Sequence, residues 1–197
     1  MFIERVRKIL MSEAEAITAI PLTPAVEQAV RKILACTGKV ITTGIGKAGY
    51  MAKKAASTFS TTGTPAIYLH PGDAPHGDVG VISHGDVLLA FSNSGRTREV
   101  IETVHFSKHL GVDTVIAVTA HTDSPLAQDS DIVLEIGQIN EPCPLGLTPT
   151  ASIVAMLALT DALALTVMEE RGFTKADFAA RHHGGYLGKK SREDHLG

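Results

Sequence analysis

The stretch 40-VITTGIGKAGYMAKKAA-56 has the form of a buried strand, a glycine turn and a helix. Its β-branched start leads into three glycines, Gly44, Gly46 and Gly49, with the spacing G-x-G-x-x-G. That spacing is typical of a dinucleotide-binding turn, in which the backbone approaches a phosphate at a helix N-terminus. Lys47 lies inside the turn, where a nicotinamide site usually needs only backbone, so the stretch predicts an α/β fold and leaves its ligand open.

Outward from this stretch, short apolar strands alternate with helical patterns. Strands are predicted over residues 39–43, 65–69, 86–91, 113–118 and 131–135. Helices are predicted over residues 2–19, 23–38, 46–61, 96–110 and near 125, followed by an apolar helix that ends near Gly172 and a short last helix. Because the strands are separated mostly by helices, we expect a five-stranded parallel sheet flanked by helices, a doubly wound α/β fold of the flavodoxin-like kind.

Composition narrows the possible functions. A chain of 197 residues with 44% hydrophobic residues fits one domain, expected as N-terminal helices (1–37), sheet and helices (38–172) and a C-terminal segment (173–197). The net charge of -3 and the lack of a long basic block argue against nucleic acid as a partner. The charged start is unlike a secretory signal, so a cytoplasmic protein is expected. The two cysteines have neither disulfide-framework nor metal-ligand spacing.

One segment, residues 151–168, has no charge except Asp161 and is long enough to span about 27 Å as a helix. The central carboxylate makes a membrane span costly. We therefore expect a helix buried in the protein or in an oligomer core, and no membrane as a partner.

Hydroxyl groups surround a glycine in 92-SNSGRTRE-99, where the third strand gives way to a helix. Ser92, Ser94 and Thr97, together with backbone N–H groups at the helix start, suit a phosphate. Serine and threonine also cap helices without any ligand. A second hydroxyl-rich helix start, 147-LTPTAS-152, favours the phosphate interpretation.

A dinucleotide site would need an acidic residue about 20 residues past the glycines, at the end of the second strand, to bind the ribose. That strand ends at His70, and the nearest acid, Asp73, lies three residues into a loop. The dinucleotide interpretation is therefore disfavoured.

Acid–base side chains gather in the same loops: Glu99, Glu141, and groups of histidines and aspartates at residues 70–78 and 182–183. Any one of these histidines alone would more often be an ordinary hydrogen-bonded residue. Their shared location at strand ends makes them candidates for proton transfer.

Taken together, the segments GIGKAG, HPGDAPHGDVG, SNSGRTREV, EPCPLGLTPTAS and GFTKADFAARHHGGYLG resemble the sugar isomerase (SIS) domain of arabinose-5-phosphate isomerases, in the family's order and spacing over residues 1 to about 190. The resemblance implies a substrate site formed by Lys47, His76, Glu99, Glu141 and His182. It places the sugar phosphate against Ser92, Asn93, Ser94 and Thr97, and Gly44, Gly46 and Thr150 complete the predicted substrate-binding set.

The resemblance also implies the reaction: interconversion of ribulose 5-phosphate and arabinose 5-phosphate through an enediol, without a cofactor, in a homotetramer whose sites are completed by neighbouring subunits. Glu99 or His182 is expected to transfer the proton, His76 to open the ring or protonate an oxygen, and Lys47 to stabilise enediolate charge. Glu141 would orient one of these. No metal is required, and zinc at His76 and His182 would be adventitious.

The single-domain form is expected to lack the pair of cystathionine-β-synthase-type modules that many family members carry after the isomerase domain. Two alternative functions stay open. Arg96 and Arg98 in the phosphate loop leave room for a hexulose or heptulose phosphate. A phosphosugar-sensing module without turnover is the alternative of a different class, because the fold also serves transcription regulators.

Overall fold

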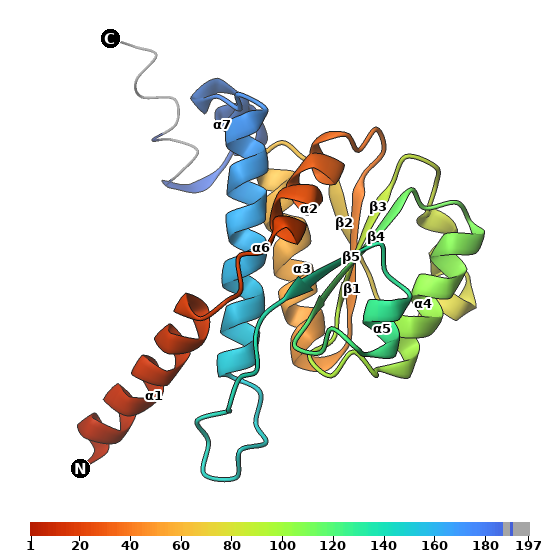
Figure 1. Ribbon diagram of the computed structural model, residues 1–197. Coiled ribbons are helices and arrows are strands. Elements are labelled where there is room, and N and C mark those ends of the chain that lie inside the picture. Colours follow the sequence, from red (N-terminus) through yellow and green to blue (C-terminus); the bar gives the residue numbers. More distant parts are fainter. Residues whose placement is uncertain (187–189, 191–197) are drawn as a thin grey trace.

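The computed structural model describes residues 1–186 and 190, so the part of the predicted C-terminal segment at residues 187–189 and 191–197 lies outside the described residues. It has a central parallel sheet between two helical layers (Figure 1). The strand order is β2-β1-β3-β4-β5. The strands are β1 Val40–Gly44, β2 Ala66–Leu69, β3 Val87–Phe91, β4 Thr114–Thr119 and β5 Ile132–Glu135. The predicted five-stranded, doubly wound sheet is confirmed.

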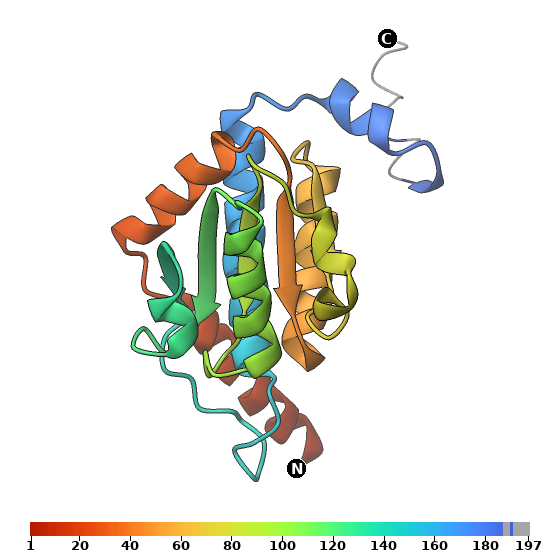
Figure 2. The ribbon, with the colours of Figure 1, turned by 90° about the vertical axis from the view of Figure 1, so that its right-hand side faces the viewer.

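Helices cover both faces of the sheet (Figure 2). One face packs on α2 (Pro24–Leu34), α3 (Gly46–Thr61) and α6 (Ala151–Glu170). The other face packs on α4 (Arg98–His109), α5 (Pro125–Gln128) and the 3₁₀ turns η1 (Ala74–His76) and η2 (Asp78–Val81). The N-terminal helix α1 (Phe2–Thr18) extends away from the body, and α7 (Lys175–Arg181) follows the C-terminal end of α6 (Figure 1).

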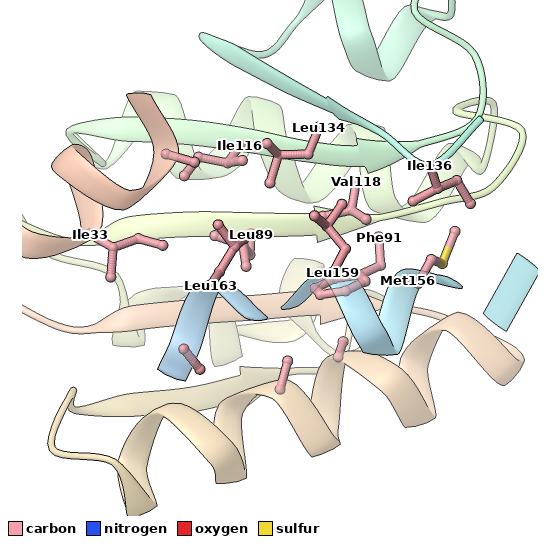
Figure 3. Packing of buried hydrophobic residues seen from close by; sticks show 14 of the residues in the cluster. Ile33, Leu89, Phe91, Ile116, Val118, Leu134, Ile136, Met156, Leu159 and Leu163 are labelled. Atoms are coloured by element: carbon pink, nitrogen blue, oxygen red, sulfur yellow. The ribbon is translucent and has the colours of Figure 1, made fainter. Parts of the chain in front are cut away.

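Alternation along the strands divides the core into two parts. In β3, Leu89 and Phe91 face α6, whereas Leu88 and Ala90 face α4. This is the period of two expected of an extended strand whose faces are both covered. Figure 3 shows the α6 side, where residues of β3, β4 and β5 meet Met156, Leu159 and Leu163.

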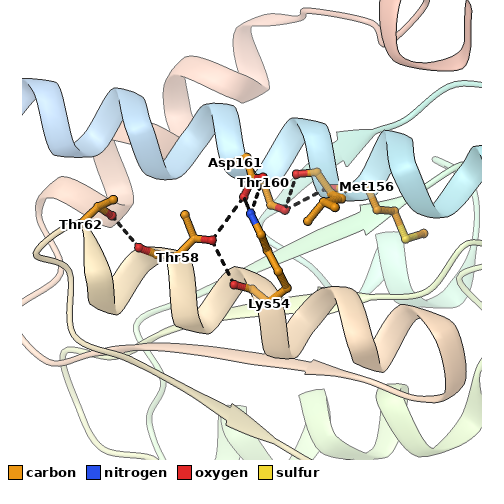
Figure 4. Close-up of polar contacts among 7 residues, drawn as sticks. Lys54, Thr58, Thr62, Met156, Thr160 and Asp161 are labelled. Carbon is orange, nitrogen blue, oxygen red and sulfur yellow. Dashed lines mark hydrogen bonds and ion pairs between the residues drawn. The ribbon is translucent and has the colours of Figure 1, made fainter. Parts of the chain in front are cut away.

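By length and composition alone, helix α6 is long and apolar enough to cross a membrane. Half of its most apolar 18-residue segment is buried within the fold. It packs against α1, α2 and α3. Asp161, its one charged residue before the last turn, pairs with Lys54 of α3, and the Thr58 hydroxyl lies 3.4 Å from the same carboxylate (Figure 4). The expectation of a helix packed within the protein is confirmed for the half of α6 that is buried.

The prediction that the second helix runs to Gly38 was wrong, because α2 ends at Leu34. Gly38 serves a different purpose: its N–H donates to the Gly85 carbonyl at 2.9 Å. A Cβ there would lie 2.2 Å from the buried Asp86 carboxylate. The glycine therefore permits the approach of another loop and does not end the helix.

Candidate active site

A cleft of about 290 Å³ opens at the carboxyl ends of β1 and β3. These strands are neighbours, but the chain leaves β1 toward α3 on one face and β3 toward α4 on the other. A crevice at such a switch point is where open α/β sheets bind ligands. The cleft is lined by Ile45, Lys47, Ala48, Phe91, Ser92, Asn93, Ser94, Thr97, Pro149 and Ile153.

The structure thus brings Lys47 together with all four residues of the predicted phosphate loop. The Ser92 and Thr97 hydroxyls are hydrogen-bonded at 2.8 Å. Thr97 is the N-cap of α4 but makes no side-chain cap bond, so capping does not account for its hydroxyl. Ser94 Oγ accepts from the Arg96 N–H at 3.2 Å.

The loop needs its glycine. Gly95 has a φ of +60°, and a Cβ there would lie 1.9 Å from the Ser124 hydroxyl. Arg98, at the first position of α4, pairs with Glu102 on the surface of that helix at 2.7 Å. The pair lies on the exposed surface of the helix, where such an ion pair contributes little energy, so the alternative of a longer sugar phosphate stays open.

The glycine turn after β1 is tightly packed. A Cβ on Gly49 would lie 2.7 Å from the Gly44 carbonyl oxygen, which also accepts a hydrogen bond from the Tyr68 hydroxyl at 2.8 Å. Gly44 and Gly46 were predicted to bind substrate, yet neither lines the cleft. Gly46 borders a separate hollow of about 130 Å³ on the other side of the turn, beside Lys53. Gly44 and Gly49 therefore allow the close packing of the turn, and Gly46 supplies its positive φ of +60°.

Glu141 lies at the N-terminus of α6. One carboxylate oxygen accepts from the Thr150 and Ala151 N–H groups at 2.7 and 2.9 Å. The other accepts from the Ser152 N–H at 3.2 Å and from the Ser152 hydroxyl, and the Thr150 hydroxyl is 3.3 Å from the first. Burial by itself raises the pKa of Glu141, but these hydrogen bonds together hold that pKa below its ordinary value.

Glu141 and Thr150 support the wall of the cleft that the start of α6 forms. The carboxylate caps the helix whose first turn carries Ile153 into the cleft wall, just after Pro149, and the Thr150 hydroxyl points to Glu141. An anion at this end of a helix is stabilised by the helix dipole. Both side chains therefore position the cleft from beside it.

The remaining predicted residues lie outside the cleft lining. His76 ends η1, and Glu99 lies in the first turn of α4; both are exposed, on elements that pack against each other. His182 follows α7, where its ring stacks on Phe178 with centroids 3.9 Å apart and its Nδ1 lies 3.1 Å from the Phe178 carbonyl oxygen. Within residues 1–186 and 190, no group of three His, Cys, Asp or Glu side chains is placed to hold a metal.

His182 lies far from the cleft of its own chain. Pro149 and Ile153 border the cleft at the start of α6, whereas α7 follows the other end of that helix (Figures 1 and 2). A helix of 20 residues spans about 30 Å. One chain cannot bring His182 to its own Lys47 in this arrangement.

Sequence reasoning missed the apolar wall of the cleft, formed by Ile45, Ala48, Phe91, Pro149 and Ile153. It also missed Tyr68, which fixes the turn before Lys47. The only local signal was the proline before the helix start in LTPTAS, because contacts between distant segments leave little trace in the spacing of residues.

Comparison with known proteins agrees with the fold and the motifs. Residues 33–166 match the SIS domain family. The arabinose 5-phosphate isomerase KdsD of Pseudomonas aeruginosa is 46% identical over 158 residues, which cover 80% of this chain and 48% of that protein. The chain thus spans about half the length of the curated relatives it matches.

Two solved structures resemble the fold over nearly the whole chain. A protein from Bacteroides fragilis, described as a putative phosphosugar isomerase involved in capsule formation, has a TM-score of 0.91 and 42% identity, covering 94% of this chain and 100% of that one. A protein of Escherichia coli CFT073 in complex with arabinose 5-phosphate has a TM-score of 0.86 and 36% identity, covering 92% and 97%. The chain belongs to the SIS domain family.

Proposed function

We propose that this protein is an aldose–ketose isomerase that interconverts ribulose 5-phosphate and arabinose 5-phosphate. The observation that carries the proposal is the cleft at the β1–β3 switch point, where Lys47 lies with the hydroxyl-rich loop 92–97. The names of the curated relatives and the arabinose 5-phosphate complex of a structural neighbour support the choice of sugar. A cytoplasmic location fits such a substrate.

The reaction moves hydrogen within the substrate, so it needs no redox cofactor. A base removes the proton from the carbon next to the carbonyl, the electron pair forms an enediolate, and the proton returns at the neighbouring carbon while a second proton moves between the two oxygens. Ser92, Ser94 and Thr97 hold the phosphate at the start of α4, where backbone N–H groups favour an anion. Lys47 offsets the enediolate charge.

In this proposal Glu99 or His182 transfers the proton between the two carbons. His76 opens the sugar ring or protonates an oxygen. Glu99 and His76 lie on neighbouring elements of one chain, but His182 is separated from Lys47 by the length of α6. His182 would therefore enter the cleft of another copy, which accounts for the expected homotetramer.

Mixing two inactive variants tests the shared site. Lys47→Met and His182→Ala chains, unfolded together and refolded, would form some sites that have both wild-type residues. We expect activity to return in the mixture and not in either variant alone. Continued inactivity of a mixture shown to co-assemble would remove His182 from the reaction.

The reaction itself is tested by NMR in deuterated water with a panel of pentose, hexulose and heptulose phosphates in the presence of a chelator. We expect turnover of ribulose 5-phosphate with deuterium at the carbon next to the carbonyl. Lys47→Met should lose turnover, whereas the matched variant Lys53→Met, outside the cleft, should retain it. Tight binding with no product and no exchange for any sugar would establish a sensor in place of an enzyme.

A further inference from the structure

Phe178 contacts the imidazole of His182 in two ways. The two rings are stacked, with centroids 3.9 Å apart and planes 8° apart. In addition, His182 Nδ1 lies 3.1 Å from the carbonyl oxygen of Phe178, four residues earlier in the chain. One residue therefore restrains both the plane of the imidazole and the direction of one of its ring nitrogens.

The partner of Nδ1 decides which ring nitrogen of His182 carries the proton. A backbone carbonyl oxygen can only accept a hydrogen bond, so Nδ1 must be the donor. In a neutral imidazole one nitrogen has the proton and the other has the basic lone pair. The lone pair of neutral His182 therefore lies on Nε2, the nitrogen farther from the backbone.

Helix α7, which carries Phe178, is held firmly at its start although it is short. In its capping box, Thr174 Oγ1 accepts from the Asp177 N–H at 3.2 Å, and the Asp177 carboxylate accepts from the Thr174 N–H at 2.9 Å. Just before the helix, Phe173 packs against the turn after α3, where a Cβ on Gly63 would lie 2.5 Å from its ring. The stacked pair therefore stands on a helix whose start is fixed by its own cap and by a neighbouring turn.

We propose that Phe178 is a positioning residue for the isomerisation, because it holds His182 as the Nδ1–H tautomer with Nε2 as the proton acceptor. The inference rests on the proposed function, in which His182 is one of two residues assigned to proton transfer. Nε2 takes the proton from the carbon next to the carbonyl, and the C–H electron pair forms the enediolate. The resulting imidazolium returns the proton to the neighbouring carbon. Nδ1 keeps its hydrogen bond to Phe178 throughout, since both nitrogens of an imidazolium are donors.

NMR of ¹⁵N-labelled histidine rings in the whole protein tests the tautomer without substrate. The chain supplies both references. His105 Nε2 lies 2.8 Å from the Asp129 carboxylate, which fixes the Nε2–H tautomer, whereas His109 Nδ1 lies 2.8 Å from the His105 carbonyl oxygen, which fixes the Nδ1–H tautomer. The His182 signals, identified by their loss in His182→Ala, should match those of His109 at a pH where the rings are neutral. An Nε2–H ring at His182 would overturn the proposal.

Steady-state kinetics on the assembled enzyme test the role in the reaction. Phe178→Leu keeps an apolar side chain but removes the flat ring. Its kcat should fall about 10-fold with KM changed less than about twofold, because misplacing a reacting group by about 1 Å can cost up to about 100-fold in rate. Phe178→Tyr keeps the stacked ring and should restore kcat. Phe106→Leu is the matched control, since it removes a partly exposed aromatic ring from α4, and it should leave both constants unchanged.

The outcomes separate this inference from the proposed function. Turnover by the wild type with an unchanged kcat in Phe178→Leu, or an equal loss in Phe178→Leu and Phe178→Tyr, would refute the positioning role alone. A wild type without turnover of any sugar would refute the proposed function and with it the use of Nε2 in catalysis.

Discussion

Replacing Glu141 by glutamine should destabilise the fold in a pH-dependent manner. In the wild-type protein the half-buried carboxylate accepts three N–H and two hydroxyl hydrogen bonds at the start of α6. Glutamine keeps one acceptor oxygen, and its amide N–H groups face the same donors. A lost cap costs about 1 to 2 kcal/mol and the lost charge–dipole attraction about 0.5 kcal/mol, so we expect a loss of about 2 kcal/mol.

The sign of the pH dependence follows from the lowered pKa. Because the folded pKa of Glu141 lies below the ordinary value of 4.5, the carboxylate stabilises the fold above that pH. The advantage of the wild type over Glu141→Gln should be full near pH 7 and disappear as the pH falls through the folded pKa.

Urea denaturation followed by circular dichroism from pH 3 to 7 measures this difference. In thermal unfolding at neutral pH, the melting temperature of Glu141→Gln should lie about 4 to 8 °C below that of the wild type. Glu169→Gln, at the exposed other end of α6, is the control and should change little. A constant difference between wild type and Glu141→Gln across the whole pH range would refute the capping role.

Four further perturbations follow from single contacts. Ser94→Ala should weaken binding of ribulose 5-phosphate by about 1 to 3 kcal/mol in calorimetry, and unchanged affinity would remove this serine from the site. Cys143, whose Sγ accepts two N–H hydrogen bonds at 3.2 Å, has a pKa lowered to about 7, so its alkylation by iodoacetamide should be half-maximal near pH 7; a midpoint near 9 would contradict this. Asp161→Asn should cost at most about 1 kcal/mol in urea, because its ion pair with α3 is partly exposed, and a larger loss would mean that the pair is more than a surface contact. Gly49→Ala should cost about 1 to 3 kcal/mol, since its Cβ would meet the Gly44 carbonyl oxygen, and a neutral effect would show that the turn is loose.

The structural features that could be predicted from the sequence are those determined by residues close together in the chain. Runs of β-branched and apolar residues indicated the five strands, because a strand buried on both faces must be apolar throughout. The loop 92–97 could be proposed as a phosphate site for the same reason: its hydroxyls, its glycine and the helix start lie within six residues. The expectation that functional loops follow the strands' carboxyl ends agrees with the position of the cleft.

The parts that sequence left undecided depend on distant contacts. Nothing near Glu141 in the sequence shows that its carboxylate caps a helix that begins ten residues later. Gly38 has the spacing of a helix stop, but its missing side chain makes room for Asp86. His182 was grouped with Lys47 by motif, and only the length of α6 shows that one chain keeps them apart.

The groups around the cleft differ in how rigidly the fold holds them, and this difference separates substrate binding from proton transfer in the proposed reaction. Tyr68 and Gly49 fix the turn that carries Lys47, and Glu141 fixes the start of α6 opposite it. Under the proposed function, the phosphate site is therefore prepared within one chain. The groups assigned to proton transfer are exposed or remote, and a desolvated environment is what tunes such groups for catalysis. Under the proposed function, a neighbouring copy that brings His182 to the cleft would also exclude water there, so assembly would supply both a reacting group and the conditions in which it reacts.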